Sequence, residues 1–218
     1  MSRFIILIIA FLLHQNLKAQ INDTILPIKD AYILKYDKFI QTKLSLNNDI
    51  EFFEVSSEPL DFIIKPNTLY KLKLNADYKF ISFAFSLSPK FIPGNNDNLR
   101  KGETNILAFG LNLNFNHWKQ GLSFNQTKGF YIANSSDFIP DWNTDTTRYI
   151  QFPELEYLGF SGYTAYSFNP NFSFSAYDNQ TEKQVKSTGS FVPKIIYRYY
   201  IIDNKIELTP TNSSQKSD

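Results

Sequence analysis

Apolar and polar residues alternate with a period of two along much of the chain. From Tyr70 to Tyr78, every second residue is apolar, and lysine, asparagine or aspartate occupies the positions between. A strand places such alternating residues on opposite faces, whereas a helix would mix them. The apolar phase shifts between Tyr78 and Ile81, where a second alternating segment begins, and this shift predicts a tight hairpin near Lys79.

The same pattern predicts the remaining elements. Residues 107–115 and 121–131 form a second predicted hairpin, with its turn at His117-Trp118-Lys119-Gln120. Further strands are expected at 38–47, 50–64, 156–168, 172–180, 190–202 and 205–209. Asn, Asp and Pro residues predict turns at 47–49, 66–67, 169–171 and 203–204. The sequence therefore predicts an all-β fold, an antiparallel up-and-down meander of about ten strands.

The connections between the predicted strands differ in length. Short turns alternate with long connections at 89–104 and 133–152, so most long loops fall at one end of the sheet. Outer-membrane β-barrels show this asymmetry and carry aromatic residues near their strand ends, as this chain does. A soluble sandwich also alternates apolar and polar residues, but the predicted strands are close to the roughly 9–11 residues that span a bilayer. The aromatic residues near strand ends are Tyr70, Tyr78, Phe80 and Trp118.

The N-terminus has the layout of an export signal. Arg3 precedes an apolar run from Phe4 to Leu13, and Leu17-Lys18-Ala19 ends in a small residue suited to cleavage. The run is about half the roughly twenty residues that a membrane-spanning helix needs, which disfavours an anchor. We therefore expect a signal peptide at 1–19, an N-terminal segment at 20–34, a barrel-like domain at 35–209 and a disordered polar tail at 210–218.

Charge and cysteine content narrow the possible partners. Removing Arg3 and Lys18 from the 22 basic residues leaves 20 against 21 acidic residues. This balance gives no basic footprint for nucleic acid, so no nucleic-acid partner is expected. The chain has no cysteine, which excludes a disulfide-stapled mini-domain and a thiolate metal site.

Four short segments resemble a known family. They are Lys65-Pro66-Asn67 before a tyrosine-rich strand, Lys128-Gly129-Phe130-Tyr131, Asn169-Pro170-Asn171-Phe172-Ser173-Phe174, and Gln184-Val185-Lys186-Ser187-Thr188-Gly189-Ser190-Phe191. The stretch from about Lys35 to Tyr200 resembles the DUF4421 family of Bacteroidota envelope proteins. The resemblance implies a signal peptide and an outer-membrane-like β-barrel, and it implies no catalytic residues.

One departure from the family concerns the C-terminus. Members usually continue well beyond the segment that matches Ser187–Phe191, whereas this chain ends in the hydrophilic Gln215-Lys216-Ser217-Asp218. An unclosed sheet would leave unpaired edges in lipid, at a cost of several kcal/mol for each polar group. The expectation is either a truncated chain with an incomplete barrel or a barrel that closes with about ten strands.

The sequence offers little for catalysis. After the signal, His117 is the one histidine, and it lies in a predicted turn beside Trp118, where an interfacial turn residue is the better interpretation than a catalytic base. A Ser–His–Asp lipase site needs only one histidine and stays a distant alternative. No GxSxG, HExxH or phosphate-binding glycine loop is present in the sequence. We therefore expect no enzyme activity, no catalytic residue and no cofactor.

Three polar groups are candidates for binding. Asp141, Asn143 and Asp145 alternate as calcium ligands do, but the glycine and the distal glutamate of a calcium loop are missing, so a solvated loop is the better interpretation. The polar segment 182–187 offers a surface for a partner. The alternate face of the strands is expected to line a lumen that side chains largely fill. Its residues are Lys71, Lys73, Asp77, Asn112, Asn114 and Asn116.

Two functional hypotheses follow. The first is a non-enzymatic outer-membrane β-barrel with a structural, binding or narrow-channel role, whose partner is the lipid of the outer membrane. The second is a periplasmic or secreted lipocalin-like barrel, in which the same apolar residues point inward onto an apolar ligand. The apolar set that faces lipid in the first case is Leu72, Leu74, Phe83, Phe85, Phe109, Leu111 and Leu113.

Overall fold

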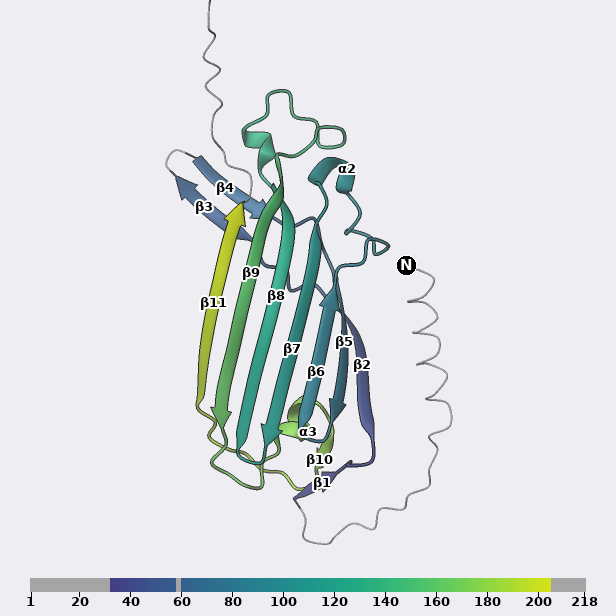
Figure 1. The fold of residues 1–218 in the computed structure, drawn as a ribbon, viewed down its shortest axis with the longest axis vertical. Coiled ribbons are helices and arrows are strands. Elements are labelled where there is room, and N and C mark those ends of the chain that lie inside the picture. The colour runs from purple at the N-terminus through teal and green to yellow at the C-terminus, as the bar shows by residue number, and fades with distance from the viewer. Residues whose placement is uncertain (1–31, 58–59, 205–218) are drawn as a thin grey trace, which may run out of the picture. The chain divides into compact units, whose positions relative to one another are not determined.

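The computed structural model describes residues 32–57 and 60–204, and these form antiparallel β-structure with short helical turns (Figure 1). The expected signal peptide, most of the N-terminal segment, the strand at 205–209 and the polar tail lie outside the described residues. Within them, one long path of hydrogen-bonded strands runs in the order β11-β9-β8-β7-β6-β5-β2, and it is called the main sheet below. Its members are β2 Ile40–Asn47, β5 Lys71–Tyr78, β6 Ile81–Leu87, β7 Asn105–Phe115, β8 Trp118–Ile132, β9 Gln151–Tyr166 and β11 Lys194–Asn204.

Smaller elements lie at the two ends of the main sheet. A hairpin of β3 and β4 pairs with the end of β8 through Ile64 and Ile132, and β1 pairs separately with β10. Among the described residues, none of the helices has the length and apolar character needed to cross a bilayer. The bounds are β1 Ile33–Lys35, β3 Phe53–Ser57, β4 Leu60–Lys65, β10 Glu182–Gln184, α2 Asn98–Lys101, α3 Phe174–Asp178 and a 3-10 turn at Ser135–Asp137.

Both central hairpins predicted from the period-two pattern are confirmed. β5 and β6 pair from Tyr78 opposite Ile81, and Lys79 takes the positive φ of 51° that their two-residue turn requires. β7 and β8 pair from Phe115 opposite Trp118, so their turn is Asn116-His117 and not residues 117–120. Asn116 tolerates the positive φ better than most residues, which explains why the chain reverses there.

Three further sequence predictions are wrong. Residues 50–64 are not one strand, because the chain reverses between β3 and β4 so that Phe53 lies opposite Ile64. Residues 172–180 are not a strand, because the Ser173 hydroxyl accepts a hydrogen bond from the Ala176 N–H and starts α3. Asp203-Asn204 is not a turn. β9 begins at Gln151 and is long enough for its residues Glu156 and Leu155 to pair with Asp203 and Asn204, so both belong to β11.

The connections largely follow the predicted asymmetry. Lys79-Phe80 and Asn116-His117 are short turns at one end of the main sheet, and the connections 48–70, 88–104 and 133–150 lie at the other end (Figure 1). The connection 167–193 is the exception, since it joins β9 to β11 at the short-turn end and contains α3 and β10.

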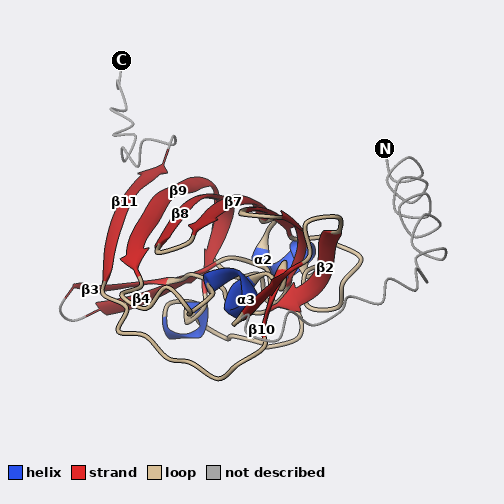
Figure 2. Ribbon diagram, turned by 90° about the horizontal axis from the view of Figure 1, so that it is seen from below, coloured by secondary structure: helices blue, strands red, loops and turns tan. Residues whose placement is uncertain are grey.

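The main sheet is curved but does not close within the described residues. Figure 2 shows the sheet curving from strand to strand, from β11 to β2, with α3 on the concave side. β2 pairs only with β5, and β11 pairs only with β9, so each leaves one edge free in the part of the chain that the structure describes. Antiparallel all-β architecture is therefore established, and the strand pairing shown is that of an open sheet.

Asn95 fastens the long connection between β6 and β7 to the start of β5. Its side-chain oxygen accepts from the backbone N–H groups of Leu69 and Tyr70 at 2.8 and 3.0 Å. Its side-chain nitrogen donates to the carbonyl oxygens of Tyr70 and Pro89 at 2.8 and 3.1 Å. The side chain is buried and its four hydrogen bonds are partly buried, so it satisfies backbone groups of which water reaches only a part.

Replacing Asn95 with alanine is expected to lower the free energy of unfolding by about 3 kcal/mol, because several buried backbone groups lose their partner. Thermal unfolding of the purified chain measures the change, and limited proteolysis should cut within residues 88–104. Asn96→Ala is the matched control, because Asn96 is exposed and should change stability by less than about 0.5 kcal/mol. Equal effects of the two substitutions would contradict the role given to Asn95.

Candidate functional site

The strand register assigns each side chain of the main sheet to one of two faces. Residues directly opposite each other in antiparallel strands point to the same side of the sheet. Following the register across the sheet gives rows of residues, one from each strand. One central row is apolar throughout: Leu44, Leu74, Phe85, Phe109, Phe124, Phe160 and Tyr199. The adjacent row, on the opposite face, is Lys43, Asn75, Ala84, Gly110, Ser123, Ser161 and Arg198.

The two faces carry the residue sets that the sequence predicts. The face of the Phe109 row, called the apolar face, holds the whole set from Leu72 to Leu113 expected to be apolar. The face of the Ser123 row, called the polar face, holds the lysine, aspartate and asparagine set, with Asn116 displaced into a turn. This division of the sheet into two faces is confirmed by the register.

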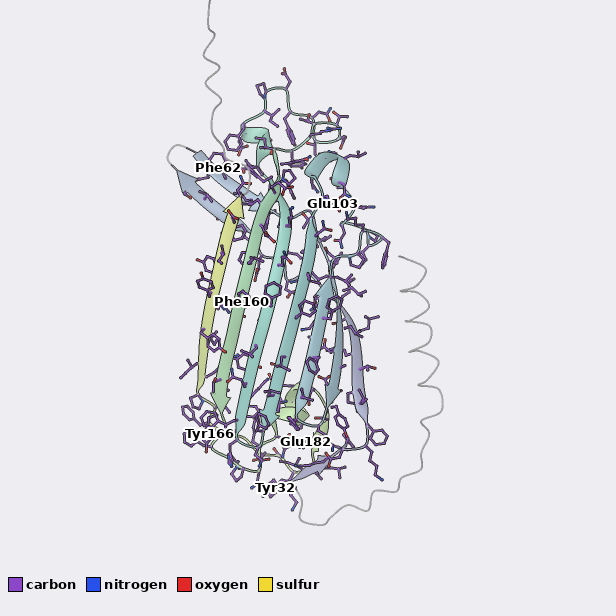
Figure 3. All side chains as sticks on the ribbon, viewed as in Figure 1. Tyr32, Phe62, Glu103, Phe160, Tyr166 and Glu182 are labelled. Atoms are coloured by element: carbon purple, nitrogen blue, oxygen red, sulfur yellow. The ribbon has the colours of Figure 1, made fainter. Side chains whose placement is uncertain are left out.

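The apolar face is the exposed one. Leu44 is 64% exposed, Phe83 56% and Phe160 52%, although each lies inside a strand of the main sheet. Phe160 lies near the middle of β9 in Figure 3. On the polar face, by contrast, Asp77 and Ser82 are only 6% and 5% exposed. A water-soluble protein normally buries its large apolar side chains and exposes its polar ones, so this sheet has the inverse arrangement.

The segment around α3 covers the polar face near the short turns. The Asn179 side-chain nitrogen donates to the Ser82 hydroxyl at 2.9 Å, and Asp178 forms an ion pair with Lys119. The Thr181 hydroxyl donates to the Lys79 carbonyl oxygen at 2.7 Å. These contacts place α3 against the polar face, in agreement with its position on the concave side in Figure 2.

Polar side chains also span the concave side farther along the strands. The Asn125 side-chain nitrogen donates to a Glu51 carboxylate oxygen at 3.0 Å, and Lys71 lies 3.2 Å from an Asp49 carboxylate oxygen. A cavity of about 490 Å³ lies here, lined from one side by Lys71 and from the other by Arg198. The polar face therefore borders a hollow lined by charged and polar side chains between the two edges of the main sheet.

Aromatic rings gather on the apolar face beside the short turns. Phe80 and Phe115 stack with ring centroids 5.2 Å apart, and Trp118 meets Tyr166 edge-on at 4.7 Å. Figure 3 shows Tyr166 at this end of the sheet. Such a cluster of amphipathic and aromatic rings matches the girdle that membrane barrels carry at an interface.

His117 lies in the turn between β7 and β8. Its Nδ1 atom is 2.7 Å from the Ser167 carbonyl oxygen, and its ring stacks on Tyr166 with centroids 5.6 Å apart. The backbone carbonyl can only accept, so Nδ1 donates this hydrogen bond. The contacts give His117 a role in joining the turn to the connection after β9.

The calcium candidates lie in the long connection between β8 and β9. The Asn143 side-chain oxygen accepts from the backbone N–H groups of Asp145 and Thr146, at 2.8 and 3.2 Å, and so forms an Asx turn. Asp141 adopts a positive φ of 53° in the same loop. Among residues 32–57 and 60–204, no group of three or more histidine, aspartate and glutamate side chains is arranged to hold a metal ion. The preference for a solvated loop over a calcium site at Asp141, Asn143 and Asp145 stays a prediction.

The end of β8 supports a cluster of aromatic and cationic side chains in the long connections. Tyr149 meets Tyr131 and Trp142 edge-on, with centroids 5.0 and 4.9 Å apart, and Arg100 lies over the Tyr149 ring at 5.3 Å. Burial, followed by the proximity of Tyr149 and then of Asp97, raises the pKa of Tyr131 to about 12. Tyr131 lies beyond the register shift between Lys128 and Phe130, where β8 still pairs with β9 through Gln151. The other members of the cluster belong to the connections 88–104 and 133–150.

The four segments that carry the family resemblance meet in two pairs. At the long-connection end, the backbone N–H of Asn67 donates to the Thr104 hydroxyl at 2.8 Å, and that hydroxyl donates to the Gly129 carbonyl oxygen at 2.6 Å. At the other end, the Asn169 side-chain nitrogen donates to the Thr188 hydroxyl at 2.9 Å and to the Gly189 carbonyl oxygen at 2.7 Å. The motifs therefore fasten the two ends of the sheet.

The polar segment 182–187 contains β10 and is tied to its surroundings. The Gln184 side-chain nitrogen donates to the carbonyl oxygens of Tyr32 and Asn171 at 3.1 and 2.8 Å. Sequence reasoning missed both this pairing and the contact of Glu51 with Asn125. A glutamate in a polar connection carries no pattern that predicts a partner so distant in the sequence.

These observations define a class of protein: an antiparallel β-sheet protein with an exposed apolar face and a covered polar face. Comparison with family models assigns the chain to a family over residues 22–218, the domain of unknown function DUF4421, and the chain belongs to that family. No curated protein and no solved structure matched the chain.

Proposed function

We propose that this protein is a non-enzymatic outer-membrane β-barrel with a structural, binding or narrow-channel role. The observation that carries the proposal is the exposure of the apolar face from β2 to β11, with Leu44 and Tyr199 both 64% exposed in the same row. In water, such a face would be a severe aggregation hazard, whereas lipid tails would bury it.

The height of the apolar face supports the proposal. On β7 the apolar positions run from Phe115 to Leu107, and the next row of this face carries Asn105, Lys128 and Glu156. At about 3.4 Å per residue, this stretch is roughly 27 Å long, and strand tilt reduces its height to roughly 20 Å. The value is close to the apolar band of about 25 Å found on membrane barrels.

The polar face supports a filled or narrow interior. α3 lies against Ser82 at one end, and the Glu51–Asn125 hydrogen bond crosses the concave side farther along. The remaining cavity of about 490 Å³ suits a hydrated pocket or narrow path better than a wide pore. The proposed barrel requires strands beyond those paired in the main sheet, because β2 and β11 each have a free edge in the described structure.

The lipocalin-like alternative has one observation in its favour. A hollow of about 680 Å³ lies on the apolar face, lined by Phe83, Phe109, Phe160 and neighbouring residues. A lipocalin-like protein would enclose such a hollow inside its barrel. Here the covered side of the sheet is the polar one, so the alternative needs the sheet to curve in the opposite sense.

Cell fractionation tests the proposal directly. We expect most of the protein in the outer-membrane fraction, resistant to extraction with alkaline carbonate and solubilised by detergent, because the apolar face replaces water contacts with lipid contacts. Recovery in the soluble periplasm without detergent would instead support the lipocalin-like alternative. A known periplasmic protein and a known outer-membrane barrel in the same preparation serve as controls for the fractions.

A further inference from the structure

Residues 48–53, called the inserted segment below, run across the polar face on their way from β2 to β3. Near the start of the segment, an Asp49 carboxylate oxygen lies 3.2 Å from the Lys71 nitrogen on β5. At its end, the Phe53 ring packs against the Tyr157 ring on β9, with centroids 5.5 Å apart. In the main sheet, β6, β7 and β8 lie between β5 and β9, so the inserted segment crosses these strands.

Glu51 holds the middle of the inserted segment. Its carboxylate accepts a hydrogen bond of 3.0 Å from the Asn125 side chain on β8 and also interacts with the Tyr157 hydroxyl on β9. Residues 48–52 belong to no strand, so side-chain contacts hold this part of the chain instead of a ladder of backbone hydrogen bonds. A hydrogen bond to an ionised carboxylate is stronger than one between neutral groups, which makes Glu51 the main anchor.

Small side chains of the sheet leave space under the inserted segment. The hollow of about 490 Å³ described above has Asp49 and Glu51 of the segment in its lining, and Lys71 and Arg198 line it from the strands. Charged walls of this kind suit polar solutes better than apolar ones, and the volume limits the hollow to a small molecule. The small residues that border the hollow are Ala84, Ala108, Gly110, Ser123 and Ser161.

We propose that Glu51 is a positioning residue that fixes the inserted segment across the polar face, and that the segment restricts entry into the hollow to small polar solutes. This inference rests on the proposed function, because in a closed barrel a solute coming from the long-connection end passes the inserted segment before it reaches the hollow. The α3 segment covers the same face at the short-turn end, through the contact of Asn179 with Ser82.

A cysteine placed in the hollow measures entry. Ala108 lines the hollow and lies directly opposite Asn125 in the strand register, and the chain has no native cysteine. In the full chain carrying Ala108→Cys, in detergent micelles, N-ethylmaleimide should react readily. A maleimide that carries a bulky branched polyethylene glycol should react at least about tenfold more slowly, because the inserted segment protects the site.

Three substitutions in the Ala108→Cys chain separate anchoring from charge. Glu51→Ala removes the anchor and should speed the reaction of the bulky maleimide at least about tenfold, while the rate of N-ethylmaleimide changes less than about threefold. Glu51→Gln loses the charge but keeps an oxygen that accepts from Asn125, so it should retain the exclusion. Asn125→Asp replaces the donor with a second carboxylate and should act like Glu51→Ala.

Ser136→Cys is the control for the reagents, because Ser136 is exposed in the connection between β8 and β9. Both maleimides should react with it at rates that Glu51→Ala leaves unchanged. Circular dichroism verifies that every variant keeps its β-structure, since a general loss of structure would speed both reagents at Ala108→Cys alike.

Any of three results overturns the proposal: equal reaction of the two maleimides with Ala108→Cys, a Glu51→Ala variant that accelerates neither or both to the same extent, or a Glu51→Gln variant as permissive as Glu51→Ala. Failure of the membrane proposal is recognised separately. A carbonate-soluble protein that still excludes the bulky maleimide would keep the role of Glu51 and lose the lipid-facing role, whereas a carbonate-resistant protein without exclusion would do the reverse.

Discussion

Replacing Leu122 with lysine is expected to prevent assembly of the protein in a membrane. Leu122 lies on the apolar face of β8 and is 45% exposed. A lysine on the lipid face near the bilayer midplane costs about 2–4 kcal/mol, whereas a lysine at a half-exposed position in water costs little. The measurement is the folded fraction after refolding into lipid vesicles, read from the shift in gel mobility between heated and unheated samples.

Asn125→Lys is the matched control, on the same strand and the opposite face. The Asn125 side chain already donates to Glu51, so a lysine there gains an ion pair on the hydrated side and should refold about as well as the unmodified chain. Two lysine substitutions of equal effect would show that the faces do not differ in environment. A Leu122→Lys chain that refolds fully into vesicles would contradict the lipid-facing assignment.

Gly129→Ala is expected to destabilise the protein by roughly 2–4 kcal/mol, through backbone strain and overpacking. Gly129 has a φ of 89°, and a Cβ atom there would lie 2.0 Å from the Glu103 carbonyl oxygen. The backbone of residue 103 is held in place because the neighbouring Thr104 hydroxyl bonds Gly129. The clash therefore cannot be relieved by a side-chain rotation, and unfolding by urea in detergent should show a lower midpoint.

Gly189→Ala is the control for the loss of a glycine as such. Apart from its neighbours in the chain, no atom of the described residues lies within 4 Å of the position that its Cβ would take, and Gly189 does not have a positive φ. The substitution should change stability by less than about 0.5 kcal/mol. A Gly129→Ala variant as stable as Gly189→Ala would mean that the approach of Glu103 to Gly129 does not persist in solution.

The sequence predicts best where neighbours in the chain are neighbours in the sheet. The Tyr78–Ile81 hairpin and the strand that includes Phe109 followed from alternation and a change of phase, because both depend on local geometry. Prediction failed where a distant partner decides the outcome. β2 pairs with β5 and not with the next strand. The helix α3 was missed for a local reason instead, because the N-terminal cap at Ser173 starts a helix where the composition favoured a strand.

The candidate site likewise has features that the sequence predicted and features that it did not. The alternation of apolar and polar residues was enough to predict that Leu111 and Asn112 lie on opposite faces, since successive side chains along a strand point to opposite sides of the sheet. The row that joins Lys43 to Arg198 was beyond sequence reasoning, because it depends on the register of every strand between β2 and β11. The contact of Asn179 with Ser82 likewise joins segments that no local pattern relates.

The sequence by itself determined the central strands, their alternation and the two chemically distinct faces, because side-chain direction in a strand follows from backbone geometry alone. Only the tertiary structure decided which face is covered. The covering segments, α3 near Ser82 and Glu51 near Asn125, come from connections whose positions depend on contacts between distant parts of the chain. The same long-range pairing left β2 and β11 at the two edges of the main sheet, running in the same direction.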